Sequence, residues 1–297
     1  MARGIRELKG RMKAVGNIQR ITKTMQMIAT ARFQKMQRRA TEAQAYSRHI
    51  ARVVGELAAA LGADADVSHP LLKQPQPAAG KELLLVLTSD RGLCGSYNAN
   101  VLRTLTAHLR EHGGLKSNNI DVELVGRKGV AYCRFNHIEL HRNLTQFGDA
   151  PSYEEVERLA EHYMQAYTSG GYDAIRVLYM HFETMSRQTP EVLQLLPLQP
   201  PKVAEDTKAT GGATYEFSPD AQTLLDELLP ITVKTRLFQC FNEAVVSEQL
   251  ARMVAMKSAT DAAGKQKKLL SRQYNRARQT AITTELTEII GGAAALE

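Results

Sequence analysis

The sequence predicts an α/β protein: a long antiparallel coiled coil of N- and C-terminal helices plus a central Rossmann-like α/β domain. Two observations predict the helices, namely apolar residues three or four positions apart near the N-terminus and a second long proline-free stretch before the C-terminus. A third is the alternation of strand-like and helix-like segments between them, which is typical of a parallel sheet. We therefore divide the chain into an N-terminal helix at 1–68, a central domain with linkers at 69–217, and a C-terminal helix with a tail at 218–297.

The expected N-terminal helix is far longer than a helix of one compact domain. No proline occurs before position 70, and a helix that continues to Leu57 is roughly 80 Å long. Such a helix cannot bury its apolar stripe inside a compact domain, so we expect the stripe to pack along another helix. The stripe consists of Ile5, Leu8, Met12, Val15, Ile18, Ile21, Met25 and Ile28.

The C-terminal stretch supplies the second helix of the pair. Ser218-Pro219 fits an N-cap followed by proline in the first turn, Pro230 is expected to kink or restart the helix, and Gly291-Gly292 marks its expected stop. Gly264 costs about 1 kcal/mol inside the helix and marks a weak point. Alanines at four-residue steps let two helix axes approach closely, and the middle domain returns the chain to its starting point, so we expect the two helices to form an antiparallel coiled coil. The expected contact row is Leu237, Phe241, Ala244, Ala251, Ala255, Ala259 and Ala263.

Between the two helices, short apolar runs alternate with helix-like patterns. A proline-containing linker is expected from His69 to Gly80 and an exposed loop at 199–217. The sequence from Ser152 to Glu155 is a capping box that opens a helix. We expect strands near 82–88, 121–125, 138–143, 174–182 and 192–198, and helices near 98–111, 128–135 and 152–168.

Composition favours an elongated protein with basic ends. Aromatic residues make up 6% of the chain and tryptophan is absent, which is sparse for one large globule. The net charge is +7, but residues 1–52 carry thirteen Lys or Arg against two acids, and residues 234–278 carry ten against three. The ends are therefore basic and the middle is acidic. This asymmetry favours an acidic partner, whether protein, nucleic acid or lipid headgroups.

Neither a membrane span nor a disulfide framework is expected. The longest clean apolar run, Leu83 to Leu87, is far short of the roughly 18 residues that a span needs. Any link to a membrane must therefore go through a partner. The cysteines, Cys94, Cys133 and Cys240, are odd in number and lack a CxxC, which favours a reducing cytoplasm.

The segment from Ser89 to Ser96 has the form of a phosphate-binding loop. It contains glycines and lies between a predicted strand and a predicted helix, where such loops occur. It lacks both the G-x-G-x-x-G spacing and the Walker lysine. Cys94 within it resembles a nucleophile in form only, because no histidine is near it in sequence. We expect a structural turn and a buried thiol.

Two further groups of polar residues also favour simpler explanations. His108 and His112 lie four apart on a predicted helix, yet no third metal ligand has a suitable spacing, so a solvated pair is expected. Glu154, Glu155 and Glu157 are expected to complement the positive end of a helix. We therefore expect no catalytic residue, no metal and no cofactor in this chain.

Three motifs resemble those of the gamma subunits of ATP synthases. The segment Asn17–Ala29 (NIQRITKTMQMIA) resembles the family's N-terminal signature, and Tyr274–Ala293 (YNRARQTAITTELTEIIGGA) resembles its C-terminal one. The segment Thr88–Gly95 (TSDRGLCG) matches the motif at the start of the family's middle domain. Together with Met253–Asp261 they span essentially the whole chain. The regulatory insertion of chloroplast gamma subunits is absent, so the resemblance is to a bacterial F-type enzyme.

This resemblance implies a non-catalytic rotor shaft. In that family, the paired helices enter the central hole of a hexameric ring of alpha and beta subunits, and the α/β domain lies with the epsilon subunit on the c-ring. The chain would couple ion-driven rotation to conformational changes at the beta subunits, as a peripheral protein at the cytoplasmic face of the cell inner membrane. The resemblance implies that Lys23, Met25, Arg278 and Gln279 contact the beta subunits, and that Ala293–Leu296 lie in an apolar bearing.

Two other functions compete with the rotor. A nucleotide-dependent enzyme with helical dimerisation arms would depend on Arg91 in the Ser89–Ser96 loop. A nucleic-acid-binding coiled coil would bind DNA with strong salt dependence. Because the basic side chains are spread around the long helices with little aromatic interleaving, we expect no nucleic-acid partner.

Overall fold

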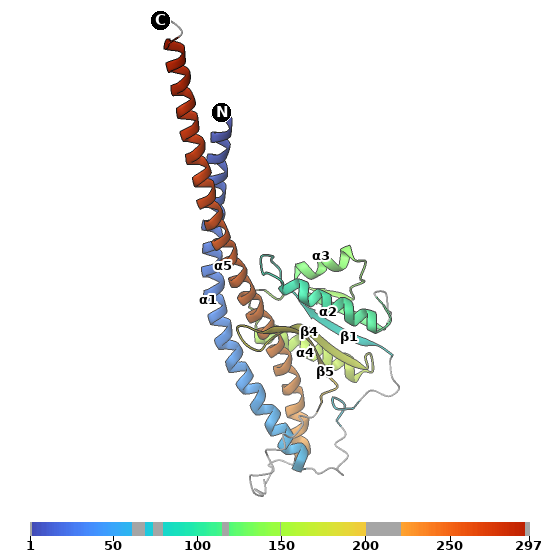
Figure 1. Cartoon of the computed structure of the whole chain (residues 1–297). Helices are drawn as coiled ribbons and strands as arrows, with labels where there is room; N and C mark the ends of the chain where they lie inside the picture. The colour runs from blue at the N-terminus through green and yellow to red at the C-terminus, as the bar shows by residue number, and fades with distance from the viewer. Residues whose placement is uncertain are drawn as a thin grey trace. The chain divides into compact units, whose positions relative to one another are not determined.

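The computed structural model describes residues 2–60, 69–73, 80–114, 119–148, 150–199 and 221–294 (Figure 1). These residues belong to two compact units, Met1–Ala31 with Arg252–Glu297, and Arg32–Ala251. The boundaries expected after residues 68 and 217, and the cap expected at Ser218-Pro219, fall at or within segments outside the described residues. The elements are α1 (Ala2–Ala60), β1 (Glu82–Leu87), α2 (Tyr97–Glu111), β2 (Ile120–Val125), α3 (Arg127–Phe135), β3 (Arg142–Leu144), α4 (Tyr153–Thr168), β4 (Ala174–Phe182), β5 (Gln188–Leu196) and α5 (Ala221–Ala294).

The two long helices are continuous, which confirms their prediction from apolar spacing. Helix α1 has 59 residues and is roughly 90 Å long. Helix α5 has 74 residues and holds Pro230 in its interior without restarting. The expected stop at Gly291-Gly292 is wrong, because α5 passes through both glycines to Ala294. Each glycine costs about 1 kcal/mol, which does not by itself end a helix.

In the first unit, the two helices pack antiparallel, as predicted. Thr260 Oγ1 donates a hydrogen bond to Thr22 Oγ1 over 2.8 Å, and a Cβ on Gly264 would lie 3.1 Å from Gln19 Nε2. Further toward the N-terminus, Gly16 lies opposite Lys267. Residues closer to the start of α1 therefore contact residues closer to the end of α5, which is the order of an antiparallel pair. Helix α5 continues through Gly264, so the glycine does not mark a break, and Gln19 of α1 lies next to it.

The expected apolar stripe of α1 is wrong in part. Ile18, Ile21 and Ile28 are 52%, 59% and 50% exposed, whereas Thr22 and Ala29 are buried. The smaller side chains face α5 because they let the helix axes come close. The result is an exposed apolar surface where the sequence suggested a core.

The expected contact row of α5 divides between the two units. Leu237, Phe241 and Ala244 are buried in the core of the second unit. Ala263 is buried in the first unit. The single row predicted from the sequence is therefore two rows with different partners. The others, Ala251, Ala255 and Ala259, are half-buried.

The second unit contains a five-stranded sheet in the order β3-β2-β1-β4-β5. Strands β1 to β4 pair in parallel, which confirms the prediction for four strands, but β5 runs antiparallel to β4. The reason is the short turn between β4 and β5, in which Thr184 and Arg187 exchange backbone hydrogen bonds. A connection this short can only join antiparallel neighbours.

The strand expected at 138–143 is shorter and later than predicted. Strand β3 begins at Arg142, because the Ile138 amide instead bonds the Cys133 carbonyl at the end of α3. Strand β5 begins four residues earlier than predicted and ends at Leu196. The other strands and the three short helices lie within about two residues of their predicted bounds.

Helices cover both faces of this sheet. On one face, Leu84 and Val86 of β1 pack with α2 and with Cys133 of α3. On the other, Leu83, Leu85 and Leu87 pack with α4, with the first part of α5 and with Ile50 of α1. The period-two alternation along β1 assigns its side chains to the two layers, as Figure 1 shows for the surrounding helices.

The segment expected as a linker from His69 to Gly80 is packed at its start. Leu71 is buried, and its carbonyl accepts a hydrogen bond from the Leu198 amide. Tyr167 donates its hydroxyl hydrogen to the Lys73 carbonyl. Residues 69–73 form neither a helix nor a strand, as expected of a linker, but they are packed against the second unit. Residues 74–79 lie outside the described residues.

Candidate partner-binding surface

The two-helix unit exposes many large apolar side chains. Ten of the fifteen exposed large hydrophobic residues in the described part of the chain belong to it, although it holds only 77 of the 297 residues. Such a concentration of exposed apolar side chains is costly in water where the side chains adjoin, and it marks a candidate surface for a partner. The ten are Ile18, Ile21, Met27, Ile28, Val254, Leu269, Ile282, Leu286, Ile289 and Ile290.

Within the described residues, the end of α5 extends beyond the start of α1. The register set by Thr22 with Thr260 and Gly16 with Lys267 places the start of α1 opposite residues near 280. A groove of about 620 Å³ lies there between the helix ends, lined by Ile5, Leu8, Ala277 and neighbouring residues. Beyond it, α5 continues to Ala294.

This free end carries an apolar stripe. Ile282, Leu286 and Ile289 are 55%, 56% and 65% exposed, and their spacing places them on one helix face. These three residues lie in the C-terminal motif but were not predicted as partner contacts. They could have been found from their spacing of three and four residues, because this part of α5 lies beyond the start of α1 and the apolar stripe there cannot pack on α1.

The same unit is strongly basic. Residues 1–31 and 252–297 carry fifteen Lys or Arg against five Asp or Glu, a net charge of +10, which leaves −3 for residues 32–251. Glu7 pairs with Arg11 over 2.6 Å within one helix turn. The surface thus combines apolar patches with excess positive charge, which suits an acidic protein surface that also offers apolar contacts.

The four residues implied as beta-subunit contacts lie in this unit in two separate places. Lys23 is exposed and Met25 is half-buried on α1, while Arg278 and Gln279 are exposed on α5. Ala277 lines the same groove as Ile5, and Lys23 is 18 residues from Ile5, or about 27 Å along the helix. The structure therefore groups them as two pairs at two heights along the coiled coil.

The Ser89–Ser96 loop is fixed by hydrogen bonds within the second unit. The first amides of α3 are taken by this loop: Arg127 donates to Asp90 Oδ1, Lys128 to the Ser89 carbonyl and Gly129 to Thr88 Oγ1. A phosphate bound at this helix end would need the same amides. The loop therefore holds β1 to α3 and leaves those donors occupied.

Cys94 is buried in the same network. Its sulfur lies 3.3 Å from Asn98 Nδ2 and 3.7 Å from Ser89 Oγ, and Asn98 also donates to Ser89 Oγ over 2.7 Å. The thiol is 2% exposed. This environment agrees with the expected structural role.

The acidic residues of α4 have separate partners. Ser152 and Glu155 form the predicted capping box, and the Ser152 backbone amide lowers the pKa of the Glu155 carboxyl by donating to it. Glu157 instead accepts from Lys234 of α5, which also bonds Glu161. Those two hydrogen bonds raise the pKa of Lys234. Glu157 therefore ties α4 to α5 rather than serving the helix end.

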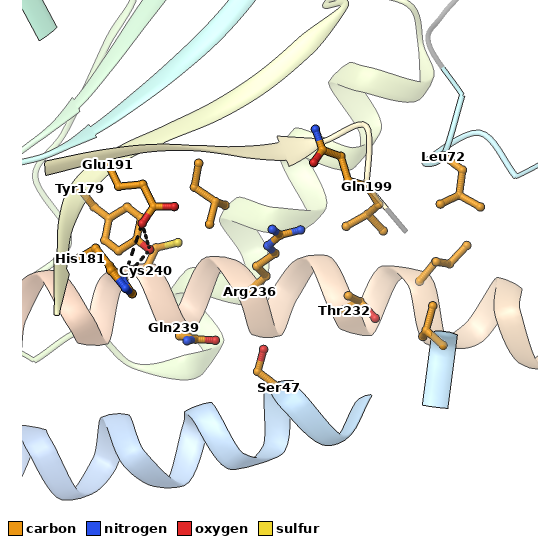
Figure 2. Close-up of a pocket in the computed structure, with 14 residues that line it drawn as sticks. Ser47, Leu72, Tyr179, His181, Glu191, Gln199, Thr232, Arg236, Gln239 and Cys240 are labelled. Atoms are coloured by element: carbon orange, nitrogen blue, oxygen red, sulfur yellow. Dashed lines mark hydrogen bonds and ion pairs between the residues drawn. The ribbon is translucent and has the colours of Figure 1, made fainter. Parts of the chain in front are cut away.

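A pocket of about 370 Å³ lies in the second unit, between β5, α5 and the last part of α1 (Figure 2). His181 Nδ1 is 2.6 Å from Glu243 Oε2 and 3.7 Å from Glu191 Oε2, so it links both strands of the β4–β5 hairpin to α5. Burial raises the pKa of Cys240, so this thiol stays protonated near neutral pH. These contacts fasten the hairpin to the helix.

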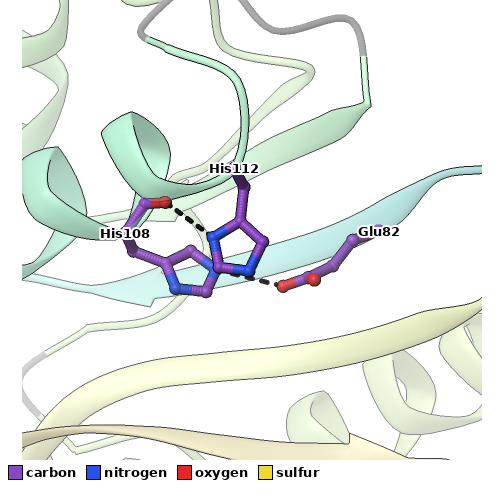
Figure 3. A group of neighbouring side chains, drawn as sticks. All are labelled: Glu82, His108 and His112. Atoms are coloured by element: carbon purple, nitrogen blue, oxygen red, sulfur yellow. Dashed lines mark hydrogen bonds and ion pairs between the residues drawn. The ribbon is translucent and has the colours of Figure 1, made fainter.

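The structure supplies a third neighbour for the histidine pair, where the sequence analysis found none. Glu82 Oε1 is 3.2 Å from His108 Nε2, and ligand atoms of Glu82, His108 and His112 all lie within 4.8 Å of one another (Figure 3). The expectation of a solvated pair without a third group is wrong. Glu82 begins a strand 26 residues before His108, so spacing on one helix could not reveal it.

These observations define a class of protein. A basic two-helix coiled coil, whose exposed apolar side chains are available to a partner, is joined to an α/β unit whose turns are held by hydrogen bonds within the unit. The model of the ATP synthase family matches residues 4–296. The chain belongs to the family of ATP synthase gamma chains, as its motifs implied, and members of this family are non-catalytic subunits.

Curated relatives agree over almost the whole chain. The ATP synthase gamma chain of Rhodopirellula baltica is 44% identical over 298 residues, covering 98% of both chains. That of Leptospira biflexa is 36% identical over 294 residues, again covering 98% of both. A chain in the cryo-EM structure of Euglena gracilis mitochondrial ATP synthase, OSCP/F1/c-ring, has the same fold with a TM-score of 0.68 and 19% identity, covering all of this chain and 95% of that one.

No helix in the described parts of the chain is both long enough and apolar enough to span a bilayer.

Proposed function

We propose that this chain is the central rotor shaft of an F-type ATP synthase. In this role it couples ion-driven rotation of the c-ring to conformational changes at the catalytic beta subunits, for ATP synthesis or hydrolysis. Family membership supports the role. The single observation that carries it in this structure is the uncovered apolar and basic surface of the two-helix unit.

The partners follow from this role. The two-helix unit enters the hexameric ring of alpha and beta subunits, and the α/β unit meets the epsilon subunit and the c-ring. The chain is a peripheral part of the F1 sector, at the cytoplasmic face of the cell inner membrane. We propose that the helices at 1–68 and 218–297 form the shaft and that 69–217 form the α/β domain with linkers, although the compact unit that contains the sheet also includes the parts of both helices within 32–251.

The shaft acts by offering different contacts to each beta subunit as it turns. A rotor can shift an equilibrium between subunit conformations only if it binds those conformations differently. Lys23 with Met25, and Arg278 with Gln279, provide contacts at two heights about 27 Å apart, and the side chains of all but Met25 are polar. Exposed Lys23, Arg278 and Gln279 are available for such contacts.

The test is reconstitution of the purified chain with alpha and beta subunits. We expect a stable complex whose ATPase activity requires this chain and falls as residues 274–297 are progressively removed. The double variant Arg278→Ala, Gln279→Ala is expected to lower activity at least several-fold, because the polar pair is lost at one height. Arg272→Ala, also an exposed arginine of α5, is the matched control and is expected to have a small effect.

Two outcomes would overturn the proposal. Failure to associate with the hexamer, together with nucleotide turnover by the chain alone that is lost on changing Arg91, would establish an enzyme instead. Salt-dependent DNA binding without hexamer assembly would establish a nucleic-acid-binding coiled coil.

A further inference from the structure

Glu82, His108 and His112 converge at the start of strand β1 and the end of helix α2. Glu82 is the first residue of β1 and pairs in register with the first residues of β2 and β4. His108 and His112 lie one helical turn apart at the C-terminal end of α2. The side chains of Glu82 and His108 are 13% and 9% exposed, whereas His112 is exposed.

Hydrogen bonding fixes the form of His112. Its Nδ1 lies 2.8 Å from the His108 carbonyl oxygen, which can only accept, so Nδ1 carries the hydrogen. In the neutral ring this leaves a lone pair on Nε2. A histidine whose second nitrogen donates to a backbone carbonyl has the arrangement typical of a metal ligand.

Glu82 supplies the negative charge of the cluster, and an arginine orients its carboxylate. The two imidazole rings lie 4.3 Å apart, with planes inclined by 35°. Glu82 has one oxygen, Oε2, on Arg176 Nη1 at 3.0 Å, and the other, Oε1, facing His108 Nε2. Arg176 therefore orients the carboxylate and leaves Oε1 as one ligand atom.

The distances fit a small tetrahedral ion. Metal bonds of about 2.0–2.1 Å place tetrahedral ligand atoms about 3.3 Å apart, and the Glu82–His108 separation is 3.2 Å. The ligand atoms of all three residues lie within 4.8 Å of one another, so binding requires a movement of the exposed His112 that keeps the hydrogen bond from its Nδ1 to the His108 carbonyl. Because His112 is exposed, water can supply a fourth ligand. Two imidazoles with one carboxylate favour zinc and similar ions over magnesium or calcium.

We propose that Glu82, His108 and His112 form a binding site for a zinc-class divalent cation, which fastens the end of α2 to the first residue of β1. The site goes beyond the rotor function and does not depend on it. Metal binding stabilises the second unit in the folded state, since the three ligands are held together only there.

The test uses the full chain after treatment with a chelator. Cobalt(II) is titrated in as a spectroscopic probe, followed by zinc. We expect one equivalent of cobalt to give the intense visible absorption of a four-coordinate ion, zinc to displace it, and the melting temperature to rise with either metal. His112→Gln is expected to abolish the absorption, and Glu82→Gln to weaken binding at least tenfold. His162→Gln is the matched control, because His162 is on α4 and outside the cluster.

Two results would overturn the proposal. One is the absence of a saturable equivalent of cobalt in the unaltered chain. The other is identical titration of the His112→Gln and His162→Gln variants, which would mean adventitious binding elsewhere. Because His112 is exposed, its variant is expected to melt as the unaltered chain does without metal, so a loss of binding there cannot be attributed to unfolding.

Discussion

At the scale of single residues, Thr88 and Gly126 determine how the Ser89–Ser96 loop is held. Thr88 Oγ1 donates to the Val125 carbonyl over 2.7 Å and accepts from the Gly129 amide. Gly126 has a φ of +99°, and a Cβ there would overlap the Thr88 carbonyl oxygen. Only glycine fits this position, because both its backbone conformation and its contact exclude a side chain.

We therefore predict that Gly126→Ala destabilises the chain by about 2 kcal/mol or more, since the alanine must either strain the backbone or displace β1. Urea unfolding of the purified chain measures this loss. Gly148→Ala is the control, because a Cβ there meets nothing within 4 Å and its φ is not positive. Equal stabilities of the two variants would show that the turn relaxes without cost.

Local sequence patterns pointed to several residues of the candidate sites, but they could not show which distant residues contact them in the fold. The Ser89–Ser96 turn has a local bond from Ser89 Oγ to the Arg91 carbonyl, but its attachment to α3 through Asp90 is long-range and was not predicted. The Ser152–Glu155 cap depends on local hydrogen bonds, so a short-range pattern predicted it. Glu82 could not be found in this way, because it reaches His108 only after β1 and α2 pack together. The roles of Lys23 and Arg278 came from resemblance to a family and stay predictions.

At the scale of elements, the spacing of apolar residues predicted the long helices correctly, but it did not predict which face of α1 is buried. Apolar spacing predicted that α1 and α5 are helices, but Ile18 and Ile21 are exposed while Thr22 faces α5. A helix that binds a partner on one side and α5 on the other has two apolar faces, and hydrophobicity alone cannot tell them apart. The antiparallel β5 was missed because strand patterns carry no direction, and only the short turn before it sets one.

The contact between α1 and α5 supports a prediction at Gly264. A Cβ there would lie 3.1 Å from Gln19 Nε2, the far end of a flexible side chain that can shift. We expect Gly264→Ala to stabilise the chain by about 0.5 kcal/mol, because the gain in helix propensity exceeds the cost of moving Gln19. Gly16→Ala, whose nearest neighbour would be Lys267 Cε at 4.0 Å, is expected to stabilise by about 1 kcal/mol.

Thermal unfolding followed by helical circular dichroism measures both variants. If Gly264→Ala lowers the melting temperature while Gly16→Ala raises it, the Gln19 amide is fixed and the close approach at Gly264 is required.

At the scale of the whole molecule, charge and apolar surface are divided unequally along the chain. The unit made of residues 1–31 and 252–297 carries a net charge of +10, whereas residues 32–251 carry −3. The exposed apolar residues are concentrated in the same basic unit. Its stability alone does not require this surface, since exposed side chains contribute little to folding. The surface is therefore explained by association with a partner.

The free end of α5 allows this explanation to be tested. Ile282 and Leu286 are 55% and 56% exposed and lie one turn apart beyond the start of α1. We predict that Ile282→Ser with Leu286→Ser changes the stability of the isolated chain by less than about 0.5 kcal/mol. The same change is expected to weaken association with alpha and beta subunits about tenfold or more, since each buried side chain contributes about 1 kcal/mol or more. Glu288→Gln, a substitution at an exposed position of the same segment, is expected to leave association nearly unchanged. Affinity is measured by titrating the labelled chain with a preparation of alpha and beta subunits, alongside melting of the chain alone. Unaltered affinity in the double serine variant would mean that this stripe is not a binding surface, whereas a large loss of stability in the isolated chain would mean that it belongs to the fold.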